Sequence, residues 1–161
     1  MFRCTRLTTI AACATAALIL SGCATLGVHS YLARDADFAH YRSYAWVEPA
    51  QFATGDPRLD NNRFFSQRVE DAMDMQLAGR GFEKTSPAAA DVLIHIHVRA
   101  DRGATPEEPA ALFVDVIDRR TTSLAWRGWA EGGLDDVVDN QRWMEARIDE
   151  AVTKIIARLP R

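Results

Sequence analysis

Apolar side chains recur at every second position from 92 to 98, with mostly polar residues between them, which is the clearest pattern in the chain. A period of two predicts a β-strand with one buried face. The side chains of the buried face would be Val92, Ile94, Ile96 and Val98, and those of the opposite face would be Leu93, His95, His97 and Arg99. The runs 111–118 and 123–131 flank a turn at 118–122 and predict a β-hairpin. In its first arm, Leu112, Val114 and Val116 would face one way and Phe113, Asp115 and Ile117 the other.

Two segments instead repeat their apolar side chains every three to four residues, which predicts amphipathic helices over 61–79 and 140–159. The inner stripe of the first helix would be Phe65, Val69, Ala72, Met73 and Leu77, and that of the second Met144, Ile148, Ala151, Val152, Ile155 and Ile156. Asp60 or Asn61 would cap the first helix, Gly81 would end it in a left-handed conformation, and Pro160 would end the second.

Three shorter segments complete the predicted fold. Residues 28–32 predict an edge strand, residues 43–47 a second strand, and residues 82–85 a short strand or the approach to one. The resulting order is β-β-α-β-β-β-α. It predicts an α+β fold, a two-layer sandwich in which an antiparallel or mixed β-sheet carries both helices on one face.

The N-terminus has the features of a secretory signal. A basic segment over 1–9 precedes an apolar run over 10–20, which is too short to span a bilayer as a helix of about 20 residues. The run ends in Leu20, Ser21, Gly22 and Cys23, which resembles the lipobox of bacterial lipoproteins. That resemblance implies cleavage before Cys23 and a covalent lipid on it, with acyl chains such as palmitate as a durable membrane anchor. The alternative is an ordinary signal peptide with an incidental cysteine.

The expected domain organisation follows from this site. Residues 1–22 would be the lipoprotein signal peptide, residues 23–34 the lipidated Cys23 with a short tether and possible edge strand, and residues 35–161 a single α+β domain. Ala24 follows the cysteine where an Asp would resemble the inner-membrane retention signal of Gram-negative bacteria. We therefore expect a protein anchored in the outer membrane, with its domain in the periplasm.

Composition and charge narrow the class of protein further. The chain has 161 residues with 19 Lys and Arg and 22 Asp and Glu, and residues 1–22 contain two of the basic and none of the acidic side chains. The remaining 17 basic against 22 acidic side chains argue against a nucleic-acid partner. Seven Phe and four Trp argue against a disordered chain.

Several segments together resemble one family, the periplasmic lipoproteins of domain-of-unknown-function family 4136. These segments are Asp37-Phe38 with Tyr41 and 43–46, then 79–82, 90–94, 114–118, 124–128, 151–156 and Leu159-Pro160. At Tyr31-Leu32 the chain departs from the family, which often has Tyr-Asp there. The resemblance implies a lipid-anchored α/β domain and offers no catalytic residues to carry over.

His95 and His97 form the main candidate for a metal site. Residues two apart on a strand point the same way, about 6.5–7 Å apart, so both imidazoles could reach one ion. If the strand at 111–118 lies alongside, Asp115 would supply a third ligand. The alternative is an ordinary polar sheet face on which Arg99 and Asp115 pair.

Other candidate sites have weaker support. Glu131, Asp135, Asp136 and Asp139 offer oxygen ligands, but their spacing does not match the calcium-binding helix-loop-helix pattern. Asp115 and Asp118 suggest a pair of carboxylates for glycoside cleavage, but they should point apart on the strand and turn. Trp126 and Trp129 should lie on opposite faces of the sheet, one in the core and the other exposed for binding.

The sequence favours a non-enzymatic module that contacts another envelope component through the sheet face or an edge strand. No serine lies in a Gly-x-Ser-x-Gly motif, and no phosphate-binding glycine loop is present. The alternative is a module that binds a small ligand or metal through His95, His97 and Asp115, with no cofactor expected beyond the lipid on Cys23. A hydrolase of envelope substrates is the least favoured class.

Overall fold

The computed structural model describes residues 26–47, 63–99, 110–132 and 141–160. Its elements are β1 Gly27–Leu32, β2 Ser43–Trp46, α2 Arg63–Gly79, β3 Glu83–Lys84, β4 Val92–Arg99, β5 Ala111–Asp118, β6 Ser123–Glu131 and α3 Gln141–Ile156. This is the predicted order, and the two-residue strand β3 lies within the segment 82–85 that was predicted as a short strand or the approach to one. The predicted caps Asp60 and Asn61 lie outside the described residues.

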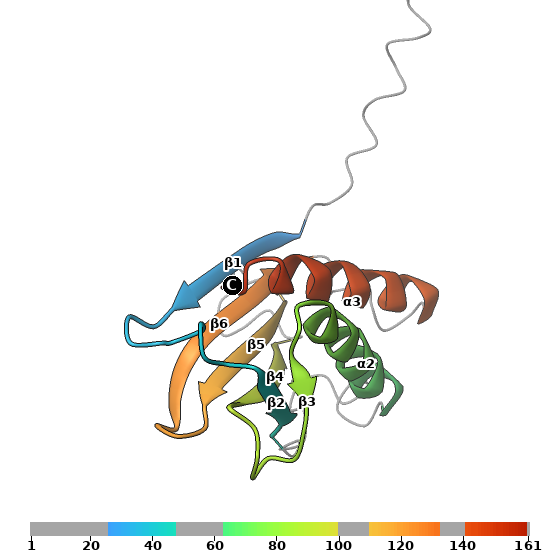
Figure 1. Ribbon diagram of the computed structural model, residues 1–161. Helices are drawn as coiled ribbons and strands as arrows, with labels where there is room; N and C mark the ends of the chain where they lie inside the picture. Colours follow the sequence, from blue (N-terminus) through green and yellow to red (C-terminus); the bar gives the residue numbers. More distant parts are fainter. Residues whose placement is uncertain (1–25, 48–62, 100–109, 133–140, 161) are drawn as a thin grey trace, which may run out of the picture.

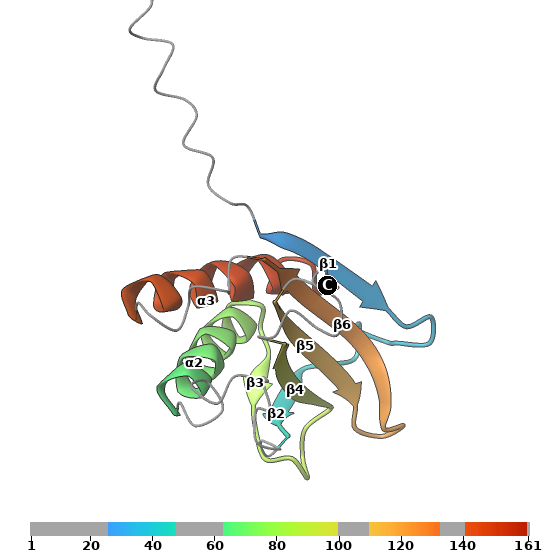
Figure 2. The same cartoon turned by 180° about the vertical axis from the view of Figure 1, so that it is seen from behind.

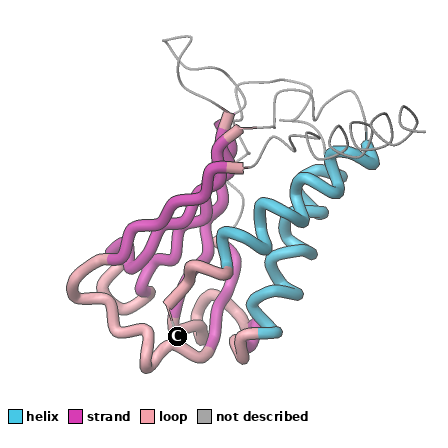
Figure 3. The backbone as a smooth tube through the Cα atoms, turned by 90° about the horizontal axis from the view of Figure 1, so that it is seen from above, coloured by secondary structure: helices cyan, strands magenta, loops and turns pink. Residues whose placement is uncertain are grey.

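One six-stranded sheet forms the first layer, with the order β1-β6-β5-β4-β2-β3. Strands β4, β5, β6 and β1 are joined in antiparallel fashion, whereas β2 runs parallel to both β4 and β3. Both helices pack side by side on one face of the sheet (Figures 1, 2 and 3). The predicted two-layer α+β sandwich with a mixed sheet is therefore confirmed.

The core lies between the sheet and the helices, and it contains the predicted apolar faces. Every side chain of the two predicted inner stripes is buried. In β4 the burial alternates residue by residue, with Val92, Ile94, Ile96 and Val98 inside. Hydrophobic burial on one face of each element thus accounts for the layered arrangement.

A close approach between α3 and β6 depends on Gly128. A Cβ atom on Gly128 would lie 2.2 Å from the indole of Trp126 and 2.7 Å from Cγ2 of Ile155. Both neighbours are buried and have little freedom to move away. The absence of a side chain at Gly128 therefore makes room for the indole beneath α3.

As predicted, Gly81 terminates α2 just beyond its last residue, Gly79, with a left-handed φ of 85°. The amide of Phe82 donates to the carbonyl of Leu77 at 3.1 Å and that of Gly81 to the carbonyl of Ala78 at 3.0 Å, a Schellman pattern. The guanidinium of Arg80 then donates to two carbonyls at the C-terminal end of α3, that of its last residue Ile156 and that of Leu159 in the following turn, both at 2.6 Å. The turn after α2 thus donates hydrogen bonds to carbonyl groups at the C-terminal ends of both helices.

Two carboxylates fix strand β2 in the sheet. Asp91 accepts hydrogen bonds from the amides of Arg42 and Ser43 and from the Ser43 hydroxyl, each at 2.9 Å. Asp74 on α2 accepts from the Tyr44 hydroxyl at 2.8 Å and from the Trp46 indole at 3.0 Å. Burial and this bond to Asp74 raise the pKa of Tyr44, so its hydroxyl stays a donor.

Among the described residues, neither helix has both the length and the apolar character needed to cross a bilayer. The segment over 1–25, with Leu20, Ser21, Gly22 and Cys23, lies outside the described residues, so the anchor stays a prediction.

We predict that Gly128→Ala lowers the free energy of unfolding by about 1–3 kcal/mol, because the added methyl group overpacks a rigid part of the core. Urea denaturation measures this change. Gly79→Ala is the matched control, because nothing lies within 4 Å of the added Cβ atom. The control should change stability little, and an equal loss in both variants would contradict the packing argument.

Candidate functional surface

The sheet face turned away from the helices carries most of the candidate residues, and we call it the open face. Its central side chains come from the odd-numbered positions of β4, β5, β6 and β1: His95, His97, Phe113, Asp115, Arg127, Trp129, His29 and Tyr31. Their alternation with core residues places them on this side. As predicted, Trp126 is buried in the core, whereas Trp129 on the opposite face is only partly buried.

Four rings on the open face stand in register across four strands, and we call them the aromatic row. His97 is paired with Phe113, Phe113 with Trp129, and Trp129 with His29. The ring centroids of successive members are 4.7, 6.3 and 5.3 Å apart, and each pair is stacked. Such stacking holds the rings in fixed orientations and so forms a preorganised surface.

A polar row lies directly beside the aromatic row. Asp115 is 6% exposed, and both of its oxygens accept hydrogen bonds from Arg127, one from Nε and one from an Nη atom, each at 2.6 Å. This bidentate contact raises the pKa of Arg127. The prediction that Arg99 pairs with Asp115 is wrong, because Arg99 instead lies over the ring of Phe113, 5.5 Å from its centroid.

The structure brings the predicted metal-ligand candidates together. His95 lies directly opposite Asp115, and ligand atoms of His95, His97 and Asp115 lie within 4.8 Å of one another. The Nδ1 atom of His97 is 4.0 Å from Oδ2 of Asp115 and is buried without a hydrogen-bond partner among the described residues. Burial lowers the pKa of His97 below its ordinary value. The negative charge of Asp115 raises this pKa in part, whereas Arg127, His95 and Arg99 lower it further.

The other acidic candidates are dispersed. Glu131 accepts from the indole of Trp129 at 2.8 Å, while Asp135, Asp136 and Asp139 lie outside the described residues. Asp118 accepts from the Tyr41 hydroxyl at 2.8 Å and from the amide of Thr121 at 2.9 Å. Because Asp115 is bound instead to Arg127, the two carboxylates of the strand have separate partners, as their alternation predicts.

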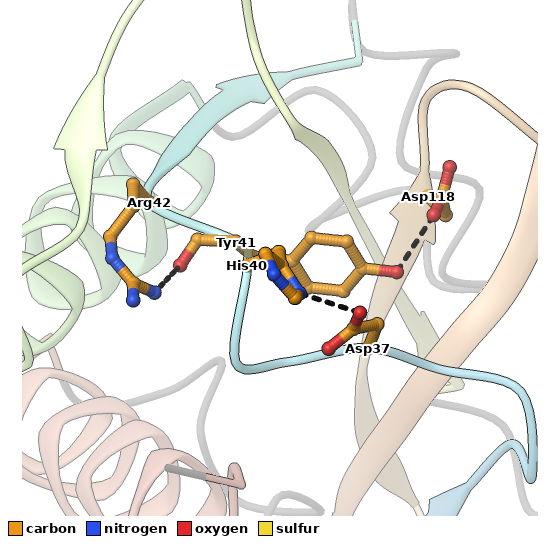
Figure 4. A network of polar contacts seen from close by, with 5 residues as sticks. All are labelled: Asp37, His40, Tyr41, Arg42 and Asp118. Carbon is orange, nitrogen blue, oxygen red and sulfur yellow. Dashed lines mark hydrogen bonds and ion pairs between the residues drawn. The ribbon is translucent and has the colours of Figure 1, made fainter.

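A polar network at the end of the hairpin was not predicted from the sequence (Figure 4). Tyr41 joins the segment before β2 to Asp118, and His40 contacts Asp37 at 2.6 Å on the surface. These residues line a recess of about 520 Å³. Burial and the bond to Asp118 raise the pKa of Tyr41 to about 12, so the hydroxyl remains a donor that holds the segment in place. Three of these residues lie in segments that carry the family resemblance, but the contact of Tyr41 with Asp118 joins parts of the chain that are distant in sequence.

A second recess of about 590 Å³ lies between the turn after α2 and the segment before β2. Its cations already have backbone partners, since Arg80 donates to carbonyls at the C-terminal end of α3 and Arg42 donates to the carbonyl of Tyr41 at 2.8 Å. Both recesses are therefore lined by side chains that hold the fold together. The polar groups of the open face lie instead on the side of the sheet that is turned away from the helices.

The fold and this surface define a two-layer α+β domain with an open sheet face. The family model for the domain of unknown function DUF4136 matches residues 28–161, and the chain belongs to this family. The resemblance seen in the sequence is thereby confirmed. No curated protein matches the chain in sequence.

Solved structures share the fold at low sequence identity. A DUF4136 family protein from Bacteroides thetaiotaomicron has a TM-score of 0.56 at 10% identity, over 83% of this chain and 95% of that one. The PelC dodecamer from Paraburkholderia phytofirmans has a TM-score of 0.51 at 14% identity, over 84% and 98%. A PDZ domain protein from Parabacteroides distasonis has a TM-score of 0.61 at 16% identity. The match spans 84% of this chain but only 35% of that protein.

We predict that the imidazole of His97 titrates with a midpoint below about 6.5, the ordinary pKa of histidine. The unfolded chain then binds a proton at a higher pH than the folded one. Stabilisation by neutral His97 is therefore complete above about pH 6.5 and is lost as the pH falls. NMR titration gives the midpoint, and urea unfolding gives the stability.

The comparison with His97→Gln isolates this histidine from the others. Between about pH 7 and about pH 5 the variant should lose less stability than the parent protein. A midpoint at or above the ordinary value, or equal losses in both proteins, would contradict the burial argument.

Proposed function

We propose that this protein is a lipid-anchored outer-membrane lipoprotein with its domain in the periplasm, acting as a non-enzymatic interaction module. The open face would bind another component of the cell envelope. The observation that carries the proposal is the aromatic row, which presents stacked rings on the side of the sheet that the helices leave uncovered. Aromatic side chains with polar neighbours are typical of the residues that contribute most to binding at protein interfaces.

The position of β1 supports an anchored domain. Strand β1 begins at Gly27, four positions after Cys23, so the chain between them spans at most about 14 Å. A lipid on Cys23 would thus hold the edge of the sheet close to the membrane surface. In Tyr31, which is 54% exposed, β1 also presents an aromatic side chain beside the aromatic row.

Two further observations favour an interaction module over a hydrolase. Asp115 and Asp118 are each bound to a different partner, Arg127 and Tyr41, so these two carboxylates do not face one bond. In addition, PelC, which shares the fold, is described as a dodecamer. A domain of this kind is therefore compatible with assembly through its surfaces.

The anchor is tested by labelling cells with radioactive palmitate and separating the two membranes. The parent protein should carry label in the outer membrane, and Cys23→Ala should carry none. Cys13→Ala is the matched control and should keep the label, because that cysteine lies within the predicted signal peptide. Ala24→Asp should move the labelled protein to the inner membrane. Label on Cys23→Ala, or none on the parent, would contradict the proposed anchor.

The interaction surface is tested by placing a photo-crosslinking amino acid at one of two exposed positions. Tyr31 lies beside the aromatic row, and Met75 lies on α2 with 66% exposure. Crosslinking in intact cells should give a discrete adduct from position 31 and none from position 75. The adduct should disappear with Trp129→Ala, because this substitution removes the central large ring of the row.

Equal adducts from both positions, or none from position 31, would contradict docking on the open face. Circular dichroism of each variant confirms that the fold is intact.

A further inference from the structure

We propose that His95, His97 and Asp115 bind one divalent transition-metal ion on the open face, with Zn²⁺ as the probe ion. This site goes beyond the proposed interaction role and does not depend on the lipid anchor. It requires that three donors reach one ion, that their chemistry suits it, and that their surroundings permit it.

The backbone places the three donors where an ion can bridge them. His95 and His97 project from the same side of β4, and Asp115 lies opposite His95 on the hydrogen-bonded neighbour β5. Their ligand atoms lie within 4.8 Å of one another. Tetrahedral coordination at about 2.0–2.2 Å puts ligand atoms about 3.4 Å apart. Side-chain rotations that bring the donor atoms up to about 1.4 Å closer together would close this difference.

The donor set is one that zinc uses in proteins. Two imidazole nitrogens and one carboxylate oxygen supply three protein ligands, and the fourth position would be left to water or a bound group. Both histidines are only partly buried, so the ion would remain accessible from solvent. This arrangement resembles an open metal site more than a closed structural one.

The Nδ1 atom of His97 gives an independent reason to expect a ligand. It is buried, it has no hydrogen-bond partner among the described residues, and it lies 4.0 Å from Oδ2 of Asp115. Buried polar atoms in folded proteins nearly always have a partner. The ring itself is held in place, because it stacks on Phe113 with an angle of 8° between the planes. An ion between Nδ1 and Oδ2 would satisfy the unpaired atom without moving the ring away from Phe113.

Arg127 has two opposing effects on this site. Its two hydrogen bonds fix the plane of the Asp115 carboxylate, as hydrogen-bonding partners of metal ligands commonly do. Each carboxylate oxygen keeps a second lone pair, so the oxygens can still bind an ion. The positive charge of Arg127, however, opposes a cation nearby. We therefore expect affinity in the micromolar range rather than the tighter binding of a dedicated structural zinc site.

Calorimetric titration of the detergent-solubilised full chain with ZnCl₂ tests the proposal, using protein purified without a polyhistidine tag. One Zn²⁺ should bind per chain. His95→Gln, His97→Gln and Asp115→Asn should each weaken binding by about tenfold or more, because each removes one of three ligands. His40→Gln is the matched control, since this exposed histidine lies outside both the cluster and the aromatic row, and it should bind as the parent protein does.

Two further measurements separate a lost ligand from a damaged fold. Circular dichroism without metal shows whether each variant is folded. Saturating Zn²⁺ should raise the melting temperature of the parent and of the His40→Gln control, but not that of folded ligand variants. Co²⁺ should give the visible absorption of a nitrogen- and oxygen-ligated ion with the parent protein. The three ligand variants should not give this absorption. No saturable binding, or unchanged binding in His95→Gln and His97→Gln, would overturn the proposal.

Discussion

The packing of Trp126 over Gly128 beneath α3 is the contact on which the rest of the structure depends. Strand β6 pairs with both β1 and β5, so the position of α3 on β6 fixes the helix layer relative to half of the sheet. The described residues contain no cysteine, so no disulfide reinforces them. Stability must come from this apolar layer and from the carboxylates that fix its edge, Asp74 and Asp91.

Local patterns were enough to predict the elements and part of the site. The alternation in β4 and β5 placed His95, His97 and Asp115 on one face, and the structure has them there because a hairpin neighbour aligns side chains across the ladder. The partner of Asp115 was not predictable in this way. It depends on the register between β5 and β6, which shifts by one residue between Val116 and Ile117 of β5. That register places Arg127 opposite the carboxylate, and Arg99 does not reach it.

The aromatic row could not be predicted from the sequence for a related reason. His29 and Trp129 become neighbours only because β1 closes the sheet beside β6, a pairing between distant parts of the chain. Nothing in the local pattern of β1 specifies which strand it joins. The network around Tyr41 is likewise nonlocal, since its hydroxyl binds Asp118 on the hairpin.

The segments that carry the family resemblance account mainly for the scaffold. Tyr41 and Asp91 hold the segment before β2, and Gly81 ends α2. His95, His97 and Trp129 lie outside those segments, whereas Asp115 and Arg127 lie within them, so the segments cover only part of the open face. The two faces of the sheet thus have separate physical roles. One buries apolar surface against the helices, and the other carries the stacked rings and the ion pair between Arg127 and the buried carboxylate of Asp115. Because β1 contributes to the open face and follows closely after Cys23, an anchor there would hold any bound partner near the membrane.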